Sequence, residues 1–279
     1  MKRYHGSYPR NESDYFSESL TYTVAKESGR RFGYLYPESI FGHKGSVFIP
    51  YANIWHTLSY TNSRLFTYLM LTQTTERMWE IGQVSKIPWR TELGNIDELE
   101  NLSKKAVGHI ISKRQFDFDS PHYSGPVLLN MLGINDSLPQ YNHPHRELQN
   151  DVTLKEPVDN IGKSASLKTL GIQAAKYLER IETGLQIYSE DIDETVFDHF
   201  NINEGQRKTI LQEIALRTNK DPREREEFNP ESITEPTDDF PNMVKDLLLH
   251  LTLRAVNEDD DGIIPISNVD GEADLLDHI

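Results

Sequence analysis

The hydrophobic pattern of the N-terminal third predicts three short extended segments and then a helix. Residues 19–27 are rich in β-branched and aromatic side chains, which is typical of a strand. A second extended segment is expected at 32–42, where Pro37 interrupts it, and a third at 46–50. From 52 to 71 the apolar residues recur mostly three, four or seven positions apart, so a single amphipathic helix is expected there.

The rest of the chain has mainly helical periodicity. Residues 78–89 are the exception, because β-rich composition and Pro88 predict a short strand. The expected helices are 95–113, 127–132 within an irregular connection, 164–200 with a break near Ser189, 203–218 with Asn201 or Asn203 as its cap, and 240–256.

This pattern predicts the α+β class, with the strands near the N-terminus and helices after them. Five consecutive parts are expected. They are a mixed α/β domain (1–92), a helix with a long Pro/His-rich connection (93–160), a helical spacer (161–220), an acidic linker (221–239), and a C-terminal helix with an acidic tail (240–279).

Charge is distributed unevenly along the chain, and this changes the meaning of the net charge of −15. Residues 1–90 hold 11 Lys/Arg and 7 Asp/Glu, a net of +4, whereas 146–279 hold 14 and 30, a net of −16. The acidity of the second half argues against nucleic acid only for that half. A neutral-to-basic working face joined to a solvated or partner-binding part is therefore expected.

Composition excludes several classes of protein. The chain has no cysteine, which rules out disulfides and thiolate chemistry and suits a reducing compartment. No apolar run approaches the roughly 18 residues of a membrane span, and the first residues lack the apolar core of a signal peptide. A cytoplasmic protein is expected.

The usual signatures of catalytic and cofactor sites are missing from the sequence. There is no glycine-rich phosphate loop of the G-x-G-x-x-G or G-x-x-x-x-G-K-[ST] type and no G-x-S-x-G elbow. His143-x-His145 lies among prolines without nearby carboxylates. A calcium-loop-like start at Asn257 has Asn268 instead of glutamate at its twelfth position. No metal or cofactor site is expected, and acids such as Asp193 are expected on a solvated helix face.

The N-terminal part instead carries polar residues suited to DNA. Lysine and arginine neutralise phosphates, and asparagine and glutamine pair with base edges. The residues suited to phosphate contact are Arg30, Arg31, Lys44, Arg64, Arg77 and Lys86, and those suited to base contact are Asn62, Gln73 and Gln83. All of them except Arg77 and Gln73 are candidate DNA contacts.

The sequences of residues 13–50, YTNSRLFTYLM (60–70) and WEIGQVSKIPW (79–89) resemble, in this order, the target-recognition region of large adenine-specific DNA methyltransferases of the type IIG and phage-exclusion (BREX-type, PglX-like) families. Residues 179–210 resemble their helical spacer, and DDDGIIPI (259–266) resembles their C-terminal region. The motifs at 61–65 and 81–88 add Ser63 and Ser85 to the candidate DNA contacts.

The resemblance implies sequence recognition in double-stranded DNA without methyl transfer. The S-adenosylmethionine loop and the Asn/Asp-Pro-Pro-Tyr/Phe motif of the catalytic half are absent, and the chain has no Pro-Pro dipeptide. S-adenosylmethionine and catalysis are therefore expected in a separate methyltransferase subunit or domain. The alternative is a protein-interaction subunit of a defence complex that never touches DNA, and a nuclease is a weaker possibility.

Overall fold

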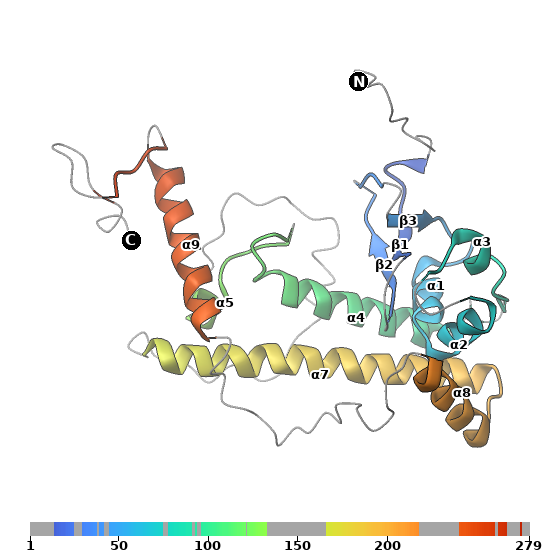
Figure 1. The fold of residues 1–279 in the computed structure, drawn as a ribbon. Coiled ribbons are helices and arrows are strands. Elements are labelled where there is room, and N and C mark those ends of the chain that lie inside the picture. The colour runs from blue at the N-terminus through green and yellow to red at the C-terminus, as the bar shows by residue number, and fades with distance from the viewer. Residues whose placement is uncertain are drawn as a thin grey trace. The chain divides into compact units, whose positions relative to one another are not determined.

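The computed structural model describes residues 14–24, 30–37, 39–41, 45–74, 78–90, 93, 96–120, 122–132, 166–217, 240–259, 262–266 and 274. These residues form eight helices and one three-stranded antiparallel sheet, so the described chain is mixed and mostly helical (Figure 1). The expected α+β class is confirmed at this level. The chain divides into two compact units. Unit 1 is Met1–Val107 with Gln186–Glu227, and unit 2 is Gly108–Leu185 with Phe228–Ile279.

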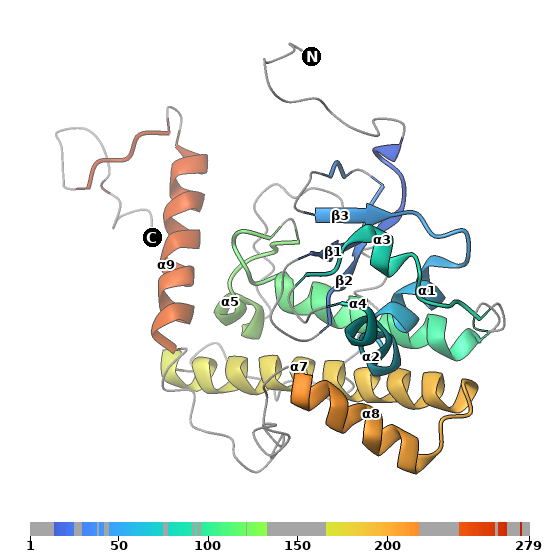
Figure 2. The same cartoon turned by 45° about the vertical axis from the view of Figure 1, so that its right-hand side comes forward.

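The sheet of unit 1 has the order β2-β1-β3, with β1 (Ser19–Thr23) between β2 (Phe32–Leu35) and β3 (Gly45–Phe48). Leu20 pairs with Tyr34 on one side and with Phe48 on the other. Strand residues two positions apart share a face, and Leu20 and Tyr22 are both buried. Helix α1 lies beside the sheet and contacts β1 and β2 (Figure 2).

Aromatic rings dominate the core of unit 1. The Phe32 ring lies 5.0 Å from Tyr22, 5.4 Å from Phe66 and 6.3 Å from Trp79, measured between ring centroids. Tyr60 stacks on Phe200 at 5.7 Å and 8°. Each buried aromatic ring removes a large apolar area from water, and such pairs add roughly 0.5–1.5 kcal/mol beyond that burial. This cluster joins the N-terminal elements to Phe200, more than a hundred residues later.

The single helix expected at 52–71 is two helices, α1 (Ile54–Thr61) and α2 (Arg64–Gln73). Ser63 separates them in an extended conformation (φ −73°, ψ 157°), and its Oγ accepts a hydrogen bond from the Phe66 N–H at 3.2 Å. Asparagine and serine side chains form hydrogen bonds with nearby backbone groups in place of the helical ones. These residues are therefore favoured at the ends of helices and not in their interiors. The apolar spacing continued across this break and concealed it.

The strand expected at 78–89 is wrong, because Ile81–Val84 forms one helical turn, α3. A capping box explains the change. The Gln83 side chain accepts from the Glu80 N–H at 3.0 Å, and the Glu80 side chain accepts from the Gln83 N–H. The Trp79 N–H just before this turn donates to the carbonyl of Val24, the residue after β1, at 3.0 Å. Two polar side chains thus decided the local conformation against β propensity.

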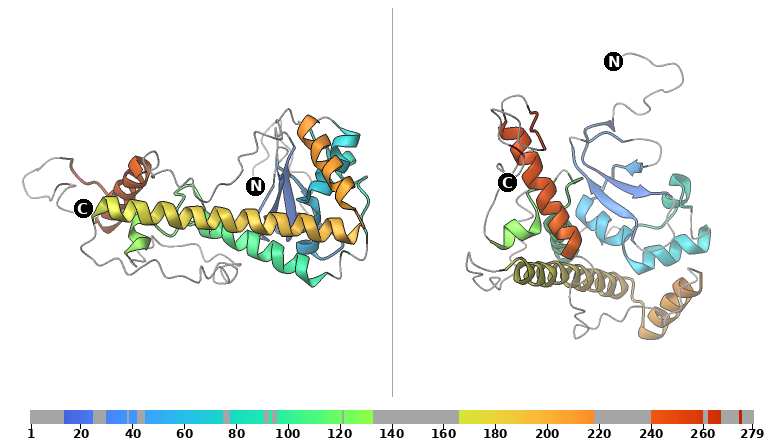
Figure 3. Two further views of the ribbon diagram at one scale, coloured as in Figure 1. Left: turned by 90° about the horizontal axis from the view of Figure 1, so that it is seen from below. Right: turned by 60° about the vertical axis from the view of Figure 1, so that its left-hand side comes forward.

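Two long helices, α4 (Asp97–Arg114) and α7 (Leu167–His199), each contribute residues to both units. The expected positions of both helices are confirmed within a few residues. The break expected near Ser189 is wrong, because α7 is continuous there (Figure 3). Its buried residues on either side of Ser189 keep helical spacing, so one partly buried serine does not end the helix.

The turn from α7 into α8 (Glu204–Arg217) is defined by its own sequence. Asn201 has a left-handed backbone (φ 55°), the Ile202 N–H bonds the Phe197 carbonyl at 2.9 Å, and the Asn201 N–H bonds the Asp198 carbonyl at 2.9 Å. This is a Schellman motif. Asn203 then caps α8, accepting from the Gln206 N–H at 3.0 Å, as expected from sequence. Helix α8 contacts α2.

Unit 2 has a small apolar core between α5 (Val127–Met131), α9 (Phe240–Glu258) and its share of α7. Helices near both positions were expected and are confirmed. The buried residues of this core are Phe116, Val127, Leu128, Met131, Leu170, Ala174 and Met243. Helix α9 begins against α7, where a Cβ at Gly171 would overlap the Phe240 ring. The expected acidic linker at 221–239 lies outside the described residues.

Candidate DNA-contact residues

Arg30 and Arg64 converge on one carboxylate, that of Asp193 in α7. Arg30 Nη2 lies 3.0 Å from Asp193 Oδ2, and Arg64 Nε lies 3.2 Å from the same oxygen. The Arg64 backbone N–H donates to Asp193 Oδ1 at 2.7 Å, so both carboxylate oxygens are engaged. Arg30 also donates to the backbone carbonyls of Asn62 and Ser189. Asp193 is only 4% exposed, which makes this a largely buried charge cluster inside unit 1.

Arg31 also serves the interior of unit 1. Its side chain is buried, its guanidinium lies 4.1 Å from the centroid of the Trp79 ring, and Nη1 donates to the Val24 carbonyl at 3.2 Å. A cation over an indole face is attracted by the ring quadrupole, more strongly when water is excluded. Arg31 therefore joins the end of β1 to Trp79 within the fold.

The side chains of Asn62 and Ser63 form hydrogen bonds with the backbone. The Asn62 side chain accepts from the Phe32 N–H at 3.1 Å and donates to the Phe32 carbonyl at 3.0 Å, which imitates the pairing of a neighbouring strand. Ser63 is fully buried, and its hydroxyl donates to the Tyr60 carbonyl at 2.7 Å. The second N–H of the Asn62 amide donates to the Leu58 carbonyl at 3.2 Å, so both of its donors are used within the protein and none is left for an adenine edge.

Five of the nine candidates are thus explained by contacts within the protein, and one important residue was missed. Asp193 was expected on a solvated face, and that expectation is wrong. The signal was its position, three and four residues before the buried Val196 and Phe197. An acid on the apolar stripe of a helix requires a partner of opposite charge when it is buried.

Gln83, Ser85 and Lys86 lie in or just after α3, and their surroundings differ. Ser85 and Lys86 are exposed, and Gln83 is partly exposed while capping the turn. On either side, Trp79 and Ile87 are buried and hold the segment in place. Between these anchors Ile81 is 55% exposed, and a Cβ at Gly82 would meet nothing within 4 Å. The segment 80–86 is therefore a surface projection with rigid ends.

Lys44, the ninth candidate, lies outside the described residues, as do His143 and His145. Asp259, from the calcium-loop-like sequence, uses its carboxylate to accept from the Ile263 N–H at 3.2 Å. Within the described part of the chain, His, Cys, Asp and Glu side chains form no group of three that a metal ion would require.

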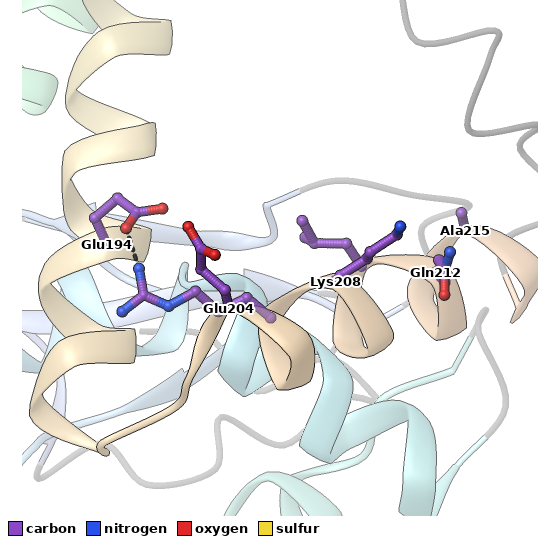
Figure 4. Close-up of a pocket in the computed structure, with 7 residues that line it drawn as sticks. Glu194, Glu204, Lys208, Gln212 and Ala215 are labelled. Carbon is purple, nitrogen blue, oxygen red and sulfur yellow. Dashed lines mark hydrogen bonds and ion pairs between the residues drawn. The ribbon is translucent and has the colours of Figure 1, made fainter.

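A groove of about 430 Å³ runs along α8, lined by Glu194, Glu204, Arg207, Lys208, Leu211, Gln212 and Ala215. Its side chains project from α8 and from the last turns of α7 (Figure 4). Arg207 pairs with Glu194 and Asp198 and donates to the Ile202 carbonyl at 2.9 Å. These contacts fix the α7–α8 turn, so the charges at this end of the groove have a structural role.

Near α1, the pKa of the Glu100 carboxyl is lowered by its contacts. Glu100 of α4 accepts from Lys104 Nζ at 2.6 Å and from Asn53 Nδ2 at 2.8 Å. The hydrogen bond from Lys104 chiefly lowers the pKa of the Glu100 carboxyl, with burial opposing and Asn53 and His56 assisting. Because Asn53 caps α1, this carboxylate links α4 to the start of α1.

No protein-family model, no curated protein and no solved structure matches the chain. The resemblance to the methyltransferase target-recognition region therefore stays a prediction. In the described part of the chain, no helix combines the length and apolar character that crossing a bilayer requires.

Proposed function

We propose that the chain is the DNA-recognition part of a site-specific adenine-N6 DNA methyltransferase of a restriction-modification or phage-exclusion system, without catalytic activity of its own. The motif resemblance supports this role, and the missing S-adenosylmethionine and Asn-Pro-Pro-Tyr-type motifs support a separate catalytic subunit. The protein would act in the cytoplasm on double-stranded DNA.

The observation that carries the proposal is the projecting segment 80–86. Binding residues are often found on short connections that a rigid scaffold holds in place. Here the buried Trp79 and Ile87 supply the scaffold, and Lys86 supplies an exposed positive charge. The exposed Ser85 hydroxyl donates only a long hydrogen bond, 3.4 Å, to the Gly82 carbonyl. The open surface at Gly82 leaves room for a backbone or a phosphate to approach closely.

The proposal is tested by the salt dependence of DNA binding. Each phosphate contact adds nearly one unit to the slope of log K against log salt concentration. Lys86→Ala is expected to weaken binding of duplex DNA and to lower that slope by about 1. Fluorescence anisotropy of a labelled duplex, from low to physiological salt, measures both quantities.

Lys208→Ala is the matched control, because Lys208 is an exposed lysine on α8, away from segment 80–86 in the sequence. It is expected to leave the slope unchanged. Equal effects of the two substitutions, or no duplex binding at low salt, would overturn the assignment of the contact surface.

A second candidate function rests on the charge of the chain's second half. Residues 146–279 carry a net charge of −16, which suits a basic protein surface and not a phosphate backbone. In that case the chain is a protein-interaction subunit of the defence complex. Absence of DNA binding by the chain alone, together with binding to a methyltransferase subunit that weakens with salt, would favour this candidate.

A further inference from the structure

Unit 2 contains a cavity of about 530 Å³ whose lining comes from α4, α5, α7, α9 and the residues after α4. Its floor is apolar, since Phe116, Val127 and Met243 are buried members of the core. Ile110 and Leu178 extend the apolar lining toward the surface. Sites for small molecules fall between roughly 300 and 1,000 Å³ and combine apolar walls with a few polar groups, and this cavity has both properties.

The charges at the rim are not equivalent. Lys113 pairs with Glu182, and Arg114 Nη1 lies 2.8 Å from Asp117 Oδ2, so both basic groups already have acidic partners. Asp246 of α9 makes no ion pair with any residue that the structure describes. Asn242, one turn earlier on α9, adds an amide to the same rim. Among the charged residues of the rim, Asp246 is thus the one without a salt bridge to a described residue, although the neighbouring Lys245 partly offsets its charge.

The surroundings of Asp246 favour compensation by a cation. Burial raises the pKa of its carboxyl above the usual 3.8, Lys245 lowers it, and Asp117 raises it. The Asp246 charge also acts on Tyr123, whose pKa is raised to about 12, chiefly by burial and further by Asp246. Asp246 is exposed at the cavity rim, so its carboxylate keeps much of its hydration, and it would attract a cation seated on the apolar floor through its charge.

We propose that this cavity binds a small organic cation, an ammonium or amidinium group on an apolar body, with Asp246 as the counter-ion. The apolar body would lie on Phe116, Val127 and Met243. A single carboxylate with one amide suits such a cation better than Ca²⁺ or Mg²⁺, which take six or more oxygen ligands. An anion is disfavoured because Lys113 and Arg114 are already paired. The inference concerns a different surface from segment 80–86 and does not depend on DNA binding.

Calorimetric titration of the full chain with benzamidine and with phenethylamine tests the proposal. Benzamide serves as the neutral match for benzamidine. One-site binding of at least one cation is expected, with benzamide weaker by about tenfold or more, the equivalent of roughly 1.4 kcal/mol. Asp246→Asn is expected to remove this preference, and Ile110→Ala to weaken binding severalfold through lost apolar contact.

Asp191→Asn is the control, because it removes the same charge from an exposed position in unit 1. It is expected to leave the titration unchanged. Circular dichroism checks that every variant is folded, and the rim position of Asp246 favours a folded variant. No saturable binding of either cation, equal binding of benzamide, or unchanged binding by Asp246→Asn would each overturn the proposal.

Discussion

Segments 62–64 and 83–86 carry the same kinds of side chain, yet the fold uses them in opposite ways. Both contain an amide, a serine and a basic residue, and both follow or end a helical turn. The side chains of Asn62 and Ser63 form hydrogen bonds with backbone groups, and the Arg64 side chain pairs with Asp193. In the second segment Ser85 and Lys86 remain at the surface.

The difference comes from what lies opposite each segment. Segment 62–64 faces β2 and α7, which supply backbone groups and a buried acid. Segment 83–86 is stabilised locally by the Glu80–Gln83 capping box and lies between the buried Trp79 and Ile87. Residue type alone does not distinguish a polar group that holds a fold together from one that meets a partner.

The largest expected effect tests the buried contacts of segment 62–64. Asp193→Ala leaves the guanidinium groups of Arg30 and Arg64 without their carboxylate and removes the acceptor of the Arg64 N–H. Because both arginines are about one-third exposed, water offsets part of the loss, and about 2–4 kcal/mol of unfolding free energy is expected to disappear. Urea denaturation measures this change.

Asp198→Ala on the same helix is the control for that experiment. Asp198 is 74% exposed and pairs with Arg207, so its removal is expected to cost between about 0 and 1 kcal/mol. Similar losses for the two variants would contradict the structural role assigned to Asp193.

A second prediction compares the two amides directly. Asn62→Ala leaves the backbone N–H and carbonyl of Phe32 without the side-chain partners they now have, at a cost of about 1–3 kcal/mol. Gln83→Ala removes only one exposed capping hydrogen bond, so a loss of about 0.5 kcal/mol is expected. Thermal unfolding measures the loss of stability in each variant. A larger loss for Gln83→Ala than for Asn62→Ala would contradict the structural role assigned to Asn62.

A third prediction concerns the exposed segment 80–86. Alanine favours a helix over glycine, and the Cβ position of Gly82 is open, so Gly82→Ala is expected to stabilise unit 1 by about 0.5–1 kcal/mol. The added methyl group would at the same time weaken duplex binding if DNA approaches this surface. Gly171→Ala should instead destabilise the protein, because its Cβ would overlap Phe240. Stabilisation with unchanged DNA affinity would argue against close approach at Gly82.

The smallest expected effect concerns pH and the start of α1. The folded protein lowers the pKa of Glu100 below the ordinary 4.5, so its ionised form contributes stability above pH 4.5 that is lost as pH falls through the folded pKa. Glu100→Gln should therefore destabilise the protein at pH 7 and have no effect in strong acid. Thermal melts across this range, with exposed Glu98→Gln as the control, measure the difference.

Local sequence determined the helices α4, α5, α8 and α9 and the turn between α7 and α8. Asn201 and Asn203 specify that turn through contacts within six residues, and the apolar stripe of α7 predicted most of its length. Such features are readable because the interacting groups are close in sequence. The capping box of α3 was equally local and could have been recognised from the spacing of Glu80 and Gln83.

Only the tertiary structure decided the fate of the polar residues. Arg30 and Arg64 meet Asp193 across more than a hundred residues of chain, and Asn62 pairs with β2 across thirty. The apolar pattern places a residue on a face of its own helix but does not say which element covers that face. The sequence by itself therefore determined the positions of α4, α5, α8 and α9 and which residues are polar enough to bind, but not the break between α1 and α2 or the turn α3. The packing of distant segments determined that Asn62–Arg64 belong to the interior of unit 1, while Ser85 and Lys86 stay exposed for a partner.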